Sequence, residues 1–131
     1  MIKILLPALM AGLLLAAPPA LAQQVHKVHF DAGTSGATIE GSVTGDEFID
    51  YRLAAKAGQT MAVSMDIDSN GYFSVLGPGG YENFIFDGSM DGAAFSGKLK
   101  ASGVYAVRIY QMGADADENV TGHFKLAVAV E

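Results

Sequence analysis

The sequence contains no cysteine among its 131 residues. This absence excludes disulfide bonds and thiolate chemistry, so the stability of the folded chain has to come from its core, even in an oxidising compartment. It also excludes a bacterial lipid anchor, which would need a cysteine after the export signal.

Basic residues are scarce as well. The chain has 8 lysines and arginines against 14 aspartates and glutamates, which gives a formal net charge of -6. Because binding to nucleic acid requires a basic face that displaces counterions, we expect no nucleic-acid partner. The acidic balance favours a basic protein as the partner.

Long apolar runs are limited to one, near the N-terminus. Lys3 precedes an apolar run from Ile4 to Ala17, and Ala20-Leu21-Ala22 supplies small residues at both positions that a signal peptidase reads. This predicts a signal peptide over residues 1–22, cleavage after Ala22, and a periplasmic or secreted protein. No later run is long enough to span a bilayer, so we expect the mature chain not to be inserted in a membrane. Residues 23–131 have the length of a single domain with its own core.

The mature part is rich in short segments in which apolar residues alternate with other residues. This period of two runs, for example, from Met61 to Ile67 and from Phe124 to Val130, and glycine-rich turns separate the segments. The pattern predicts an all-β fold, an antiparallel β-sandwich of about eight short strands. Without helical segments between the strands, we expect no parallel crossovers. The residues expected in the core are Ile49, Tyr51, Leu53, Val63, Met65, Val75, Tyr105, Val107, Ile109, Leu126 and Val128.

The stretch from Asp66 to Gly71, DIDSNG, matches the first half of an EF-hand calcium loop. The bidentate glutamate that such a loop needs at its twelfth position is replaced by Gly77, and a strand precedes the loop instead of a helix. We therefore favour a turn that closes a hairpin, with Asn70-Gly71 in a type I′ conformation. A weak calcium site built on Asp66, Asp68 and a second loop remains the alternative.

Catalytic constellations are not evident. His26 and His29 are three residues apart, which in a strand places them on opposite faces, and His123 lies on the solvent side of its segment. No nucleophile is accompanied by a base and an orienting group. We predict a protein that is not an enzyme and has no catalytic residues, no metal and no cofactor.

Four ordered motifs resemble a known family. They are GTSGATIEGSVTGDEFIDYRLAAKAGQTMAVSM (residues 33–65), YFSVLGPGG (72–80), LKASGVYAVRIYQM (99–112) and FKLAVAV (124–130). Together they resemble bacterial periplasmic inhibitors of g-type lysozyme and related exported sandwich domains akin to the pre-peptidase C-terminal domain. The resemblance implies a non-enzymatic binding protein that blocks the cleft of a cationic g-type lysozyme with loops at one edge of the sandwich.

The loop from Met112 to Asn119 departs from that family. The resemblance places arginine where this sequence has Gly113 and Asp117, and a basic residue where it has Glu118. Two alternatives to the inhibitor therefore stay open. One is an envelope binding or structural module that has lost the inhibitory arginines, and the other is a calcium-responsive module that uses Asp66, Asp68, Asp115 and Asp117. For the inhibitor, the partner-binding residues expected are Asp115 and Asn119 in this loop, helped by a neighbouring edge that contains Ser35, Gly36 and Tyr110.

Overall fold

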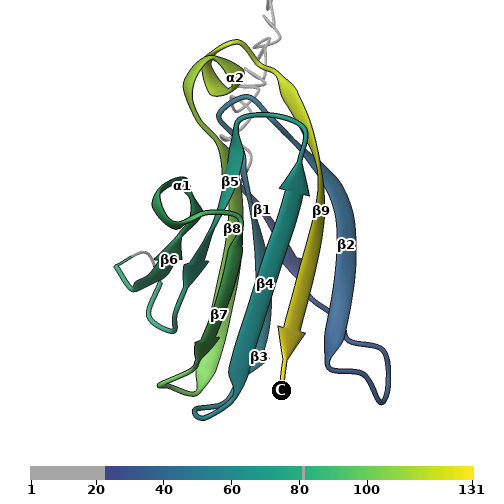
Figure 1. Ribbon diagram of the computed structural model, residues 1–131, viewed down its shortest axis with the longest axis vertical. Coiled ribbons are helices and arrows are strands. Elements are labelled where there is room, and N and C mark those ends of the chain that lie inside the picture. The colour runs from purple at the N-terminus through teal and green to yellow at the C-terminus, as the bar shows by residue number, and fades with distance from the viewer. Residues whose placement is uncertain (1–22, 81) are drawn as a thin grey trace, which may run out of the picture.

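The structure is a computed structural model that describes residues 23–80 and 82–131 (Figure 1). The predicted signal peptide, residues 1–22, lies outside the described residues. Within them the chain forms nine strands and two short helices. In order these are β1 (Gln23–Lys27), β2 (Gly36–Thr44), β3 (Phe48–Ala55), β4 (Thr60–Ile67), β5 (Gly71–Leu76), β6 (Phe84–Asp87), α1 (Gly88–Asp91), β7 (Ala94–Lys98), β8 (Gly103–Gln111), α2 (Gly113–Asp117) and β9 (Thr121–Val130).

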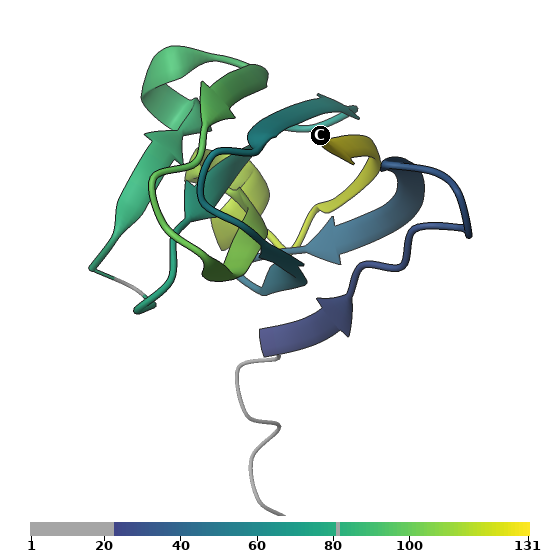
Figure 2. The ribbon, with the colours of Figure 1, turned by 90° about the horizontal axis from the view of Figure 1, so that it is seen from below.

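The strands make two sheets that pack face to face, as the sequence predicts (Figures 1 and 2). One sheet has the order β1-β3-β8-β5-β6 and the other the order β2-β9-β4-β7. All but one of the strand pairs are antiparallel. No helix in the described part of the chain has the length and hydrophobicity that crossing a membrane requires. The predicted antiparallel β-sandwich is therefore confirmed.

The core lies between the two sheets. Every predicted core residue is buried, because each occupies the inward position of its strand's alternation. Phe73 and Phe124 add aromatic rings to the same cluster. Their side chains remove a large apolar area from water, which is the main stabilising contribution in a chain without disulfide bonds.

The expectation that the fold has no parallel crossovers is wrong at one edge. β1 pairs with β3 in parallel, with Gln23 opposite Phe48 and Lys27 opposite Arg52. Between these two strands the chain crosses to the other sheet as β2 and then returns. A strand in the opposite sheet thus makes the crossover that a helix makes in α/β folds.

The predicted hairpin at Asn70-Gly71 is also wrong. β4 belongs to the four-stranded sheet and β5 to the five-stranded sheet, so residues 68–70 link the two layers. Neither Asn70 nor Gly71 has a positive φ. A Cβ at position 71 would overlap Cδ1 of Ile67, so a larger residue here would require the end of the Ile67 side chain to move.

Candidate partner-binding site

Three connections meet at one end of the sandwich, which we call the α2 end. They are the β2–β3 turn (residues 45–47), the β4–β5 link (68–70) and the segment around α2 (112–120). The sheet register brings them together, because Thr44 lies opposite Thr121 and Ile67 lies opposite Phe124. Figure 1 shows α2 projecting beyond the strands at the top of the molecule.

α2 is a short helix bounded by two residues with left-handed backbone. Gly113 has φ 65° at its start, and Asn119 has φ 56° just after its end. Backbone bonds from Glu118 N to the Ala114 carbonyl (2.8 Å) and from Val120 N to the Asp115 carbonyl (3.1 Å) close the helix. Glycine accommodates this conformation and asparagine tolerates it, which explains why the chain reverses direction here.

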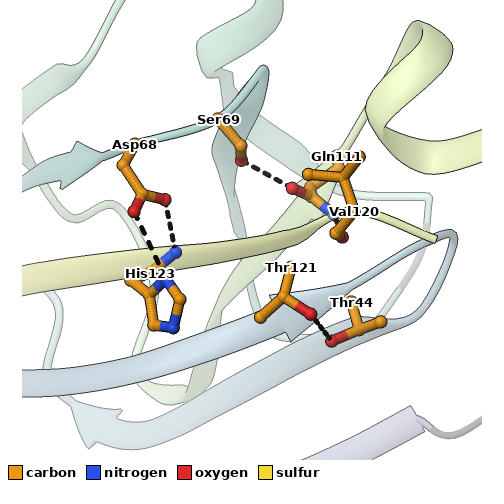
Figure 3. A network of polar contacts seen from close by, with 7 residues as sticks. All are labelled: Thr44, Asp68, Ser69, Gln111, Val120, Thr121 and His123. Carbon is orange, nitrogen blue, oxygen red and sulfur yellow. Dashed lines mark hydrogen bonds and ion pairs between the residues drawn. The ribbon is translucent and has the colours of Figure 1, made fainter. Parts of the chain in front are cut away.

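A buried amide joins the three connections. Gln111 is 6 % exposed, and its Nε2 donates to the carbonyls of Val120 (2.8 Å) and Gly45 (3.3 Å). Its Oε1 accepts a hydrogen bond from Ser69 Oγ at 2.5 Å (Figure 3). A fully satisfied polar network of this kind orders the segments that it connects.

Asp68 ties the β4–β5 link to β9. Its carboxylate accepts a hydrogen bond from the backbone N of His123 at 2.6 Å and lies 3.2 Å from His123 Nδ1 (Figure 3). The backbone hydrogen bond is the main reason that the pKa of Asp68 lies below its ordinary value. Between β2 and β9, the hydroxyls of Thr44 and Thr121 share a hydrogen bond of 2.8 Å.

These contacts show what the polar residues of the calcium-like stretch, residues 66–71, do in the fold. Asp68 and Ser69 make intramolecular hydrogen bonds, so the carboxylate and hydroxyl that resemble metal ligands tie the link to its neighbours. Within the described residues, no group of three or more histidine, aspartate or glutamate side chains is placed to hold a metal ion. The stretch is a connection between sheets, and the absence of micromolar calcium binding stays a prediction.

The structure brings two of the predicted binding residues together at the α2 end. Asp115 is partly buried, and its Oδ2 accepts a hydrogen bond from Asn70 N at 2.6 Å. Asn119 is exposed and closes α2. Both therefore shape the segment as well as occupying its surface.

Tyr110 lies on the outer face of the five-stranded sheet. Its hydroxyl donates to Asp87 Oδ1 at 2.8 Å, and its ring lies 6.1 Å from that of Tyr72. Burial raises the pKa of Tyr110, while hydrogen bonds from Ser89 and Tyr110 lower the pKa of Asp87. Tyr110 is thus near the α2 end, with its hydroxyl already engaged.

Ser35 and Gly36 lie at the opposite end of the sandwich. Gly36 is opposite Ala129 near the end of β9, whereas Thr44 is opposite Thr121 at its start. The eight residue steps between Gly36 and Thr44 correspond to roughly 26 Å of strand. The expectation that Ser35 and Gly36 form an edge neighbouring the last loop is therefore wrong.

Charge is unevenly distributed along the sandwich. The three connections at the α2 end contain no lysine or arginine, and Asp46, Asp117 and Glu118 are exposed there. At the opposite end, Lys56 follows β3, and Lys98 and Lys100 lie at the end of β7 and just after it. The three connections of the α2 end therefore present acidic side chains and no lysine or arginine.

Sequence reasoning missed the polar residues that organise these surfaces. Gln111 continues the inward alternation of Tyr105, Val107 and Ile109, so a polar residue at an inward position was the available signal. Asp50 lies between the core residues Ile49 and Tyr51 in β3, so alternation places it on the outer face, yet it is 2 % exposed and forms a bidentate pair with Arg108 at 2.7 and 2.8 Å. The strand register that places them opposite each other is not contained in either segment alone.

Comparisons with known proteins agree with this architecture. No family model matches the chain. A curated relative, the inhibitor of g-type lysozyme from Escherichia coli (strain K12), is 29% identical over 112 residues, which cover 79% of this chain and 79% of that protein. The crystal structure of a periplasmic inhibitor of g-type lysozyme from Aeromonas hydrophila is 37% identical, with a TM-score of 0.74, and covers 84% of this chain and 100% of that one.

A more distant match concerns the fold alone. The pre-peptidase C-terminal domain of a collagenase from Bacillus anthracis has a TM-score of 0.56 at 15% identity, covering 84% of this chain and 97% of that one. Both resemblances inferred from the sequence motifs are thereby confirmed.

Proposed function

Because the chain belongs to the family of periplasmic inhibitors of g-type lysozyme, we propose that it binds a g-type lysozyme and blocks the enzyme's cleft with the α2 end. Like its relatives it is a periplasmic binding protein and not an enzyme. We further propose that residues 1–22 direct its export and are removed, leaving residues 23–131 as one domain.

The α2 end is the proposed contact surface because it projects beyond the strands and because hydrogen bonds join its three connections (Figure 1). Gln111, Asp68 and Asp115 hold the three connections together through hydrogen bonds of 2.5 to 3.3 Å. Because such a loop is ordered before binding, it loses little conformational freedom when it enters a cleft. Met112, 44 % exposed, supplies apolar surface beside the exposed Asp117 and Glu118.

The charge of this end determines what it recognises. Asp117 and Glu118 can accept hydrogen bonds but cannot donate them, so they pair with basic groups and not with the acids of a lysozyme cleft. We therefore propose that the partner is a cationic g-type lysozyme whose basic side chains border the cleft. Opposite charge also accelerates encounter. Tyr110, Asp115 and Asn119 remain the proposed contacts or supports of this surface.

One observation favours a second function, an envelope binding module without inhibitory activity. Gly113 has φ 65°, a conformation that an arginine side chain would adopt only with strain. The backbone of this loop therefore suits glycine better than the arginine that the family resemblance places here, as expected of a module without the inhibitory arginines.

The deciding experiment measures cell-wall lysis by a g-type lysozyme in the presence of purified residues 23–131, with a c-type lysozyme as the specificity control. We expect inhibition of the g-type enzyme that weakens as salt increases. At constant salt, Asp117→Asn should inhibit less than the natural protein, and Asp117→Arg should not inhibit at all. If the natural protein inhibits no lysozyme while Asp117→Arg gains inhibition, the inhibitor proposal is wrong and the module without inhibitory activity is correct.

A further inference from the structure

Asn70, the fifth residue of the calcium-like stretch, carries an inference that rests on the proposed function. We propose that Asn70 is a positioning residue that holds the α2 segment in its lysozyme-binding conformation before the enzyme arrives. It would act through Met112 and Asp115, without needing to touch the lysozyme itself.

Asn70 makes four hydrogen bonds within the α2 end. Its backbone N donates to Asp115 Oδ2 (2.6 Å), and its carbonyl accepts from Met112 N (3.0 Å). Its side-chain Nδ2 donates to the Met112 carbonyl (3.0 Å), and its Oδ1 accepts from the Tyr72 hydroxyl (2.6 Å). One residue thus connects the β4–β5 link, α2 and the outer face of the five-stranded sheet.

The α2 segment needs such external support. A helix of five residues is far below the length that is stable alone in water, and its N-cap residue, Met112, makes no side-chain capping bond. Both backbone groups of Met112 are instead bonded to Asn70, directly before the left-handed Gly113. The entry into α2 is therefore fixed from outside the segment.

The side-chain chemistry at position 70 is specific. The site requires one donor toward the Met112 carbonyl and one acceptor toward the Tyr72 hydroxyl, and a carboxamide supplies both. An aspartate would lack the donor and would place a second carboxylate beside Asp115. An alanine would lack both groups but would keep the two backbone bonds.

The first test compares Asn70→Ala with a matched variant at the other end, Ser102→Ala. Ser102 Oγ accepts a hydrogen bond from Ala57 N at 2.9 Å, so this change also removes an exposed contact between two turns. We expect Asn70→Ala to bind g-type lysozyme roughly tenfold more weakly and Ser102→Ala to bind normally. Asn70→Asp should be at least as impaired as Asn70→Ala.

Hydrogen exchange in the free protein measures the positioning without any enzyme. The amides of Met112, Glu118 and Val120 donate the bonds that define the segment, and we expect them to exchange faster in Asn70→Ala but not in Ser102→Ala. Unchanged exchange with weakened inhibition would overturn the proposal and make Asn70 a direct contact. Faster exchange with unchanged inhibition would overturn it as well, because preorganisation would then not matter for binding.

A cross-link distinguishes positioning from contact. Residues 70 and 112 continue the antiparallel β5–β8 ladder, in which Gly71 lies opposite Gln111, so their Cα atoms are about 5 Å apart, within disulfide range. Because the chain has no other cysteine, Asn70→Cys/Met112→Cys forms a single defined bridge. We expect the oxidised double variant to inhibit as strongly as Met112→Cys alone, and the reduced double variant to inhibit roughly tenfold more weakly than Met112→Cys.

Failure of the cross-link to restore inhibition to the level of Met112→Cys alone would contradict a positioning role. Absence of inhibition by the natural protein would instead refute the proposed function, and the exchange experiment would still report whether Asn70 orders α2.

Discussion

The pair of Asp50 and Arg108 shows how much a single outer-face residue contributes to this fold. Asp50 is 2 % exposed, and the Arg108 guanidinium also stacks over the Phe48 ring at 4.4 Å. Asp50→Ala would leave a largely buried guanidinium without its carboxylate. We expect a loss of about 3 kcal/mol in the free energy of unfolding, measured by urea denaturation.

The matched control is the exposed pair of Lys125 and Glu40, 3.6 Å apart with side chains 59% and 75% exposed. Glu40→Ala should change stability by less than about 0.5 kcal/mol, because solvent screens exposed pairs. Equal effects of the two changes would contradict the structural role assigned to Asp50.

Gly113 is a second residue whose effect can be measured alone. Because its φ is 65°, Gly113→Ala should destabilise the protein by about 1 kcal/mol, whereas Gly113→Asn should cost less, since asparagine tolerates left-handed backbone. Thermal unfolding of the three proteins checks this order. An alanine variant as stable as the asparagine variant would mean that the backbone at Gly113 relaxes freely.

Asp68 provides a pH-dependent contribution. Its pKa in the folded protein is lowered from its ordinary value of 3.8, mainly by the hydrogen bond from His123 N. Its stabilisation is therefore present above the unfolded-state pKa and is lost as the pH falls through the folded-state pKa. We expect the unfolding free energy of the natural protein to fall more steeply below pH 4 than that of Asp68→Asn. An NMR titration that places the Asp68 pKa at or above 3.8 would contradict this.

At the scale of elements, the hydrogen bonds of Gln111 couple the three connections of the α2 end. Gln111→Leu removes the side-chain partner of the Gly45 carbonyl and of the Ser69 hydroxyl, and one of the two donors to the Val120 carbonyl, which also accepts from Gly45 N. We expect a loss of about 2 kcal/mol and faster exchange in α2, compared with about 1 kcal/mol for Ser69→Ala, which removes one hydrogen bond. Equal losses in chemical denaturation would show that the amide does not couple the connections.

The elements also show why the core was predictable and the connectivity was not. Alternation identifies which residues of a strand face inward, and burial of Val63, Met65 and Leu126 follows from that alone. It carries no information about which sheet a strand joins, so the sequence alone predicts a hairpin where the chain passes from β4 in one sheet to β5 in the other. Asn-Gly commonly forms tight hairpins, but here tertiary bonds to α2 determine its conformation.

The candidate site likewise contains some residues whose proximity the sequence predicts and others whose position depends on the strand topology. Asp115 and Asn119 are local to one loop, so their proximity could be inferred from the sequence. Ser35 and Gly36 were grouped with them without knowledge of the strand direction, which places them at the other end of β2. The sequence predicts Asn70 in a hairpin turn, which is wrong, because a polar turn residue has the same appearance whether it closes a hairpin or bonds to a neighbouring loop.

At the scale of the whole molecule, the uneven charge should affect the rate of association more than the lifetime of the complex. We expect Asp117→Asn/Glu118→Gln to slow association with a cationic lysozyme several-fold at low salt, and the difference to shrink at high salt. Lys98→Gln/Lys100→Gln, at the opposite end, should not slow it. Surface plasmon resonance at two ionic strengths measures both. Slower association in the lysine variant would contradict docking by the α2 end.

The sheet order also has a consequence for biogenesis. β8 lies between β3 and β5, and β9 lies between β2 and β4, so the last long strands in the sequence are interior strands of both sheets. In a chain that emerges from a translocation channel N-terminus first, β2 has no native neighbour until β9 emerges, and β3 and β4 have only the edge strands β1 and β7. Completion of both sheets therefore waits for the C-terminal third, and high contact order makes that step slow. We expect this delay to keep the polypeptide unfolded during translocation. Its early strands then stay incompletely paired and exposed until β8 and β9 emerge, which is the state that chaperones bind.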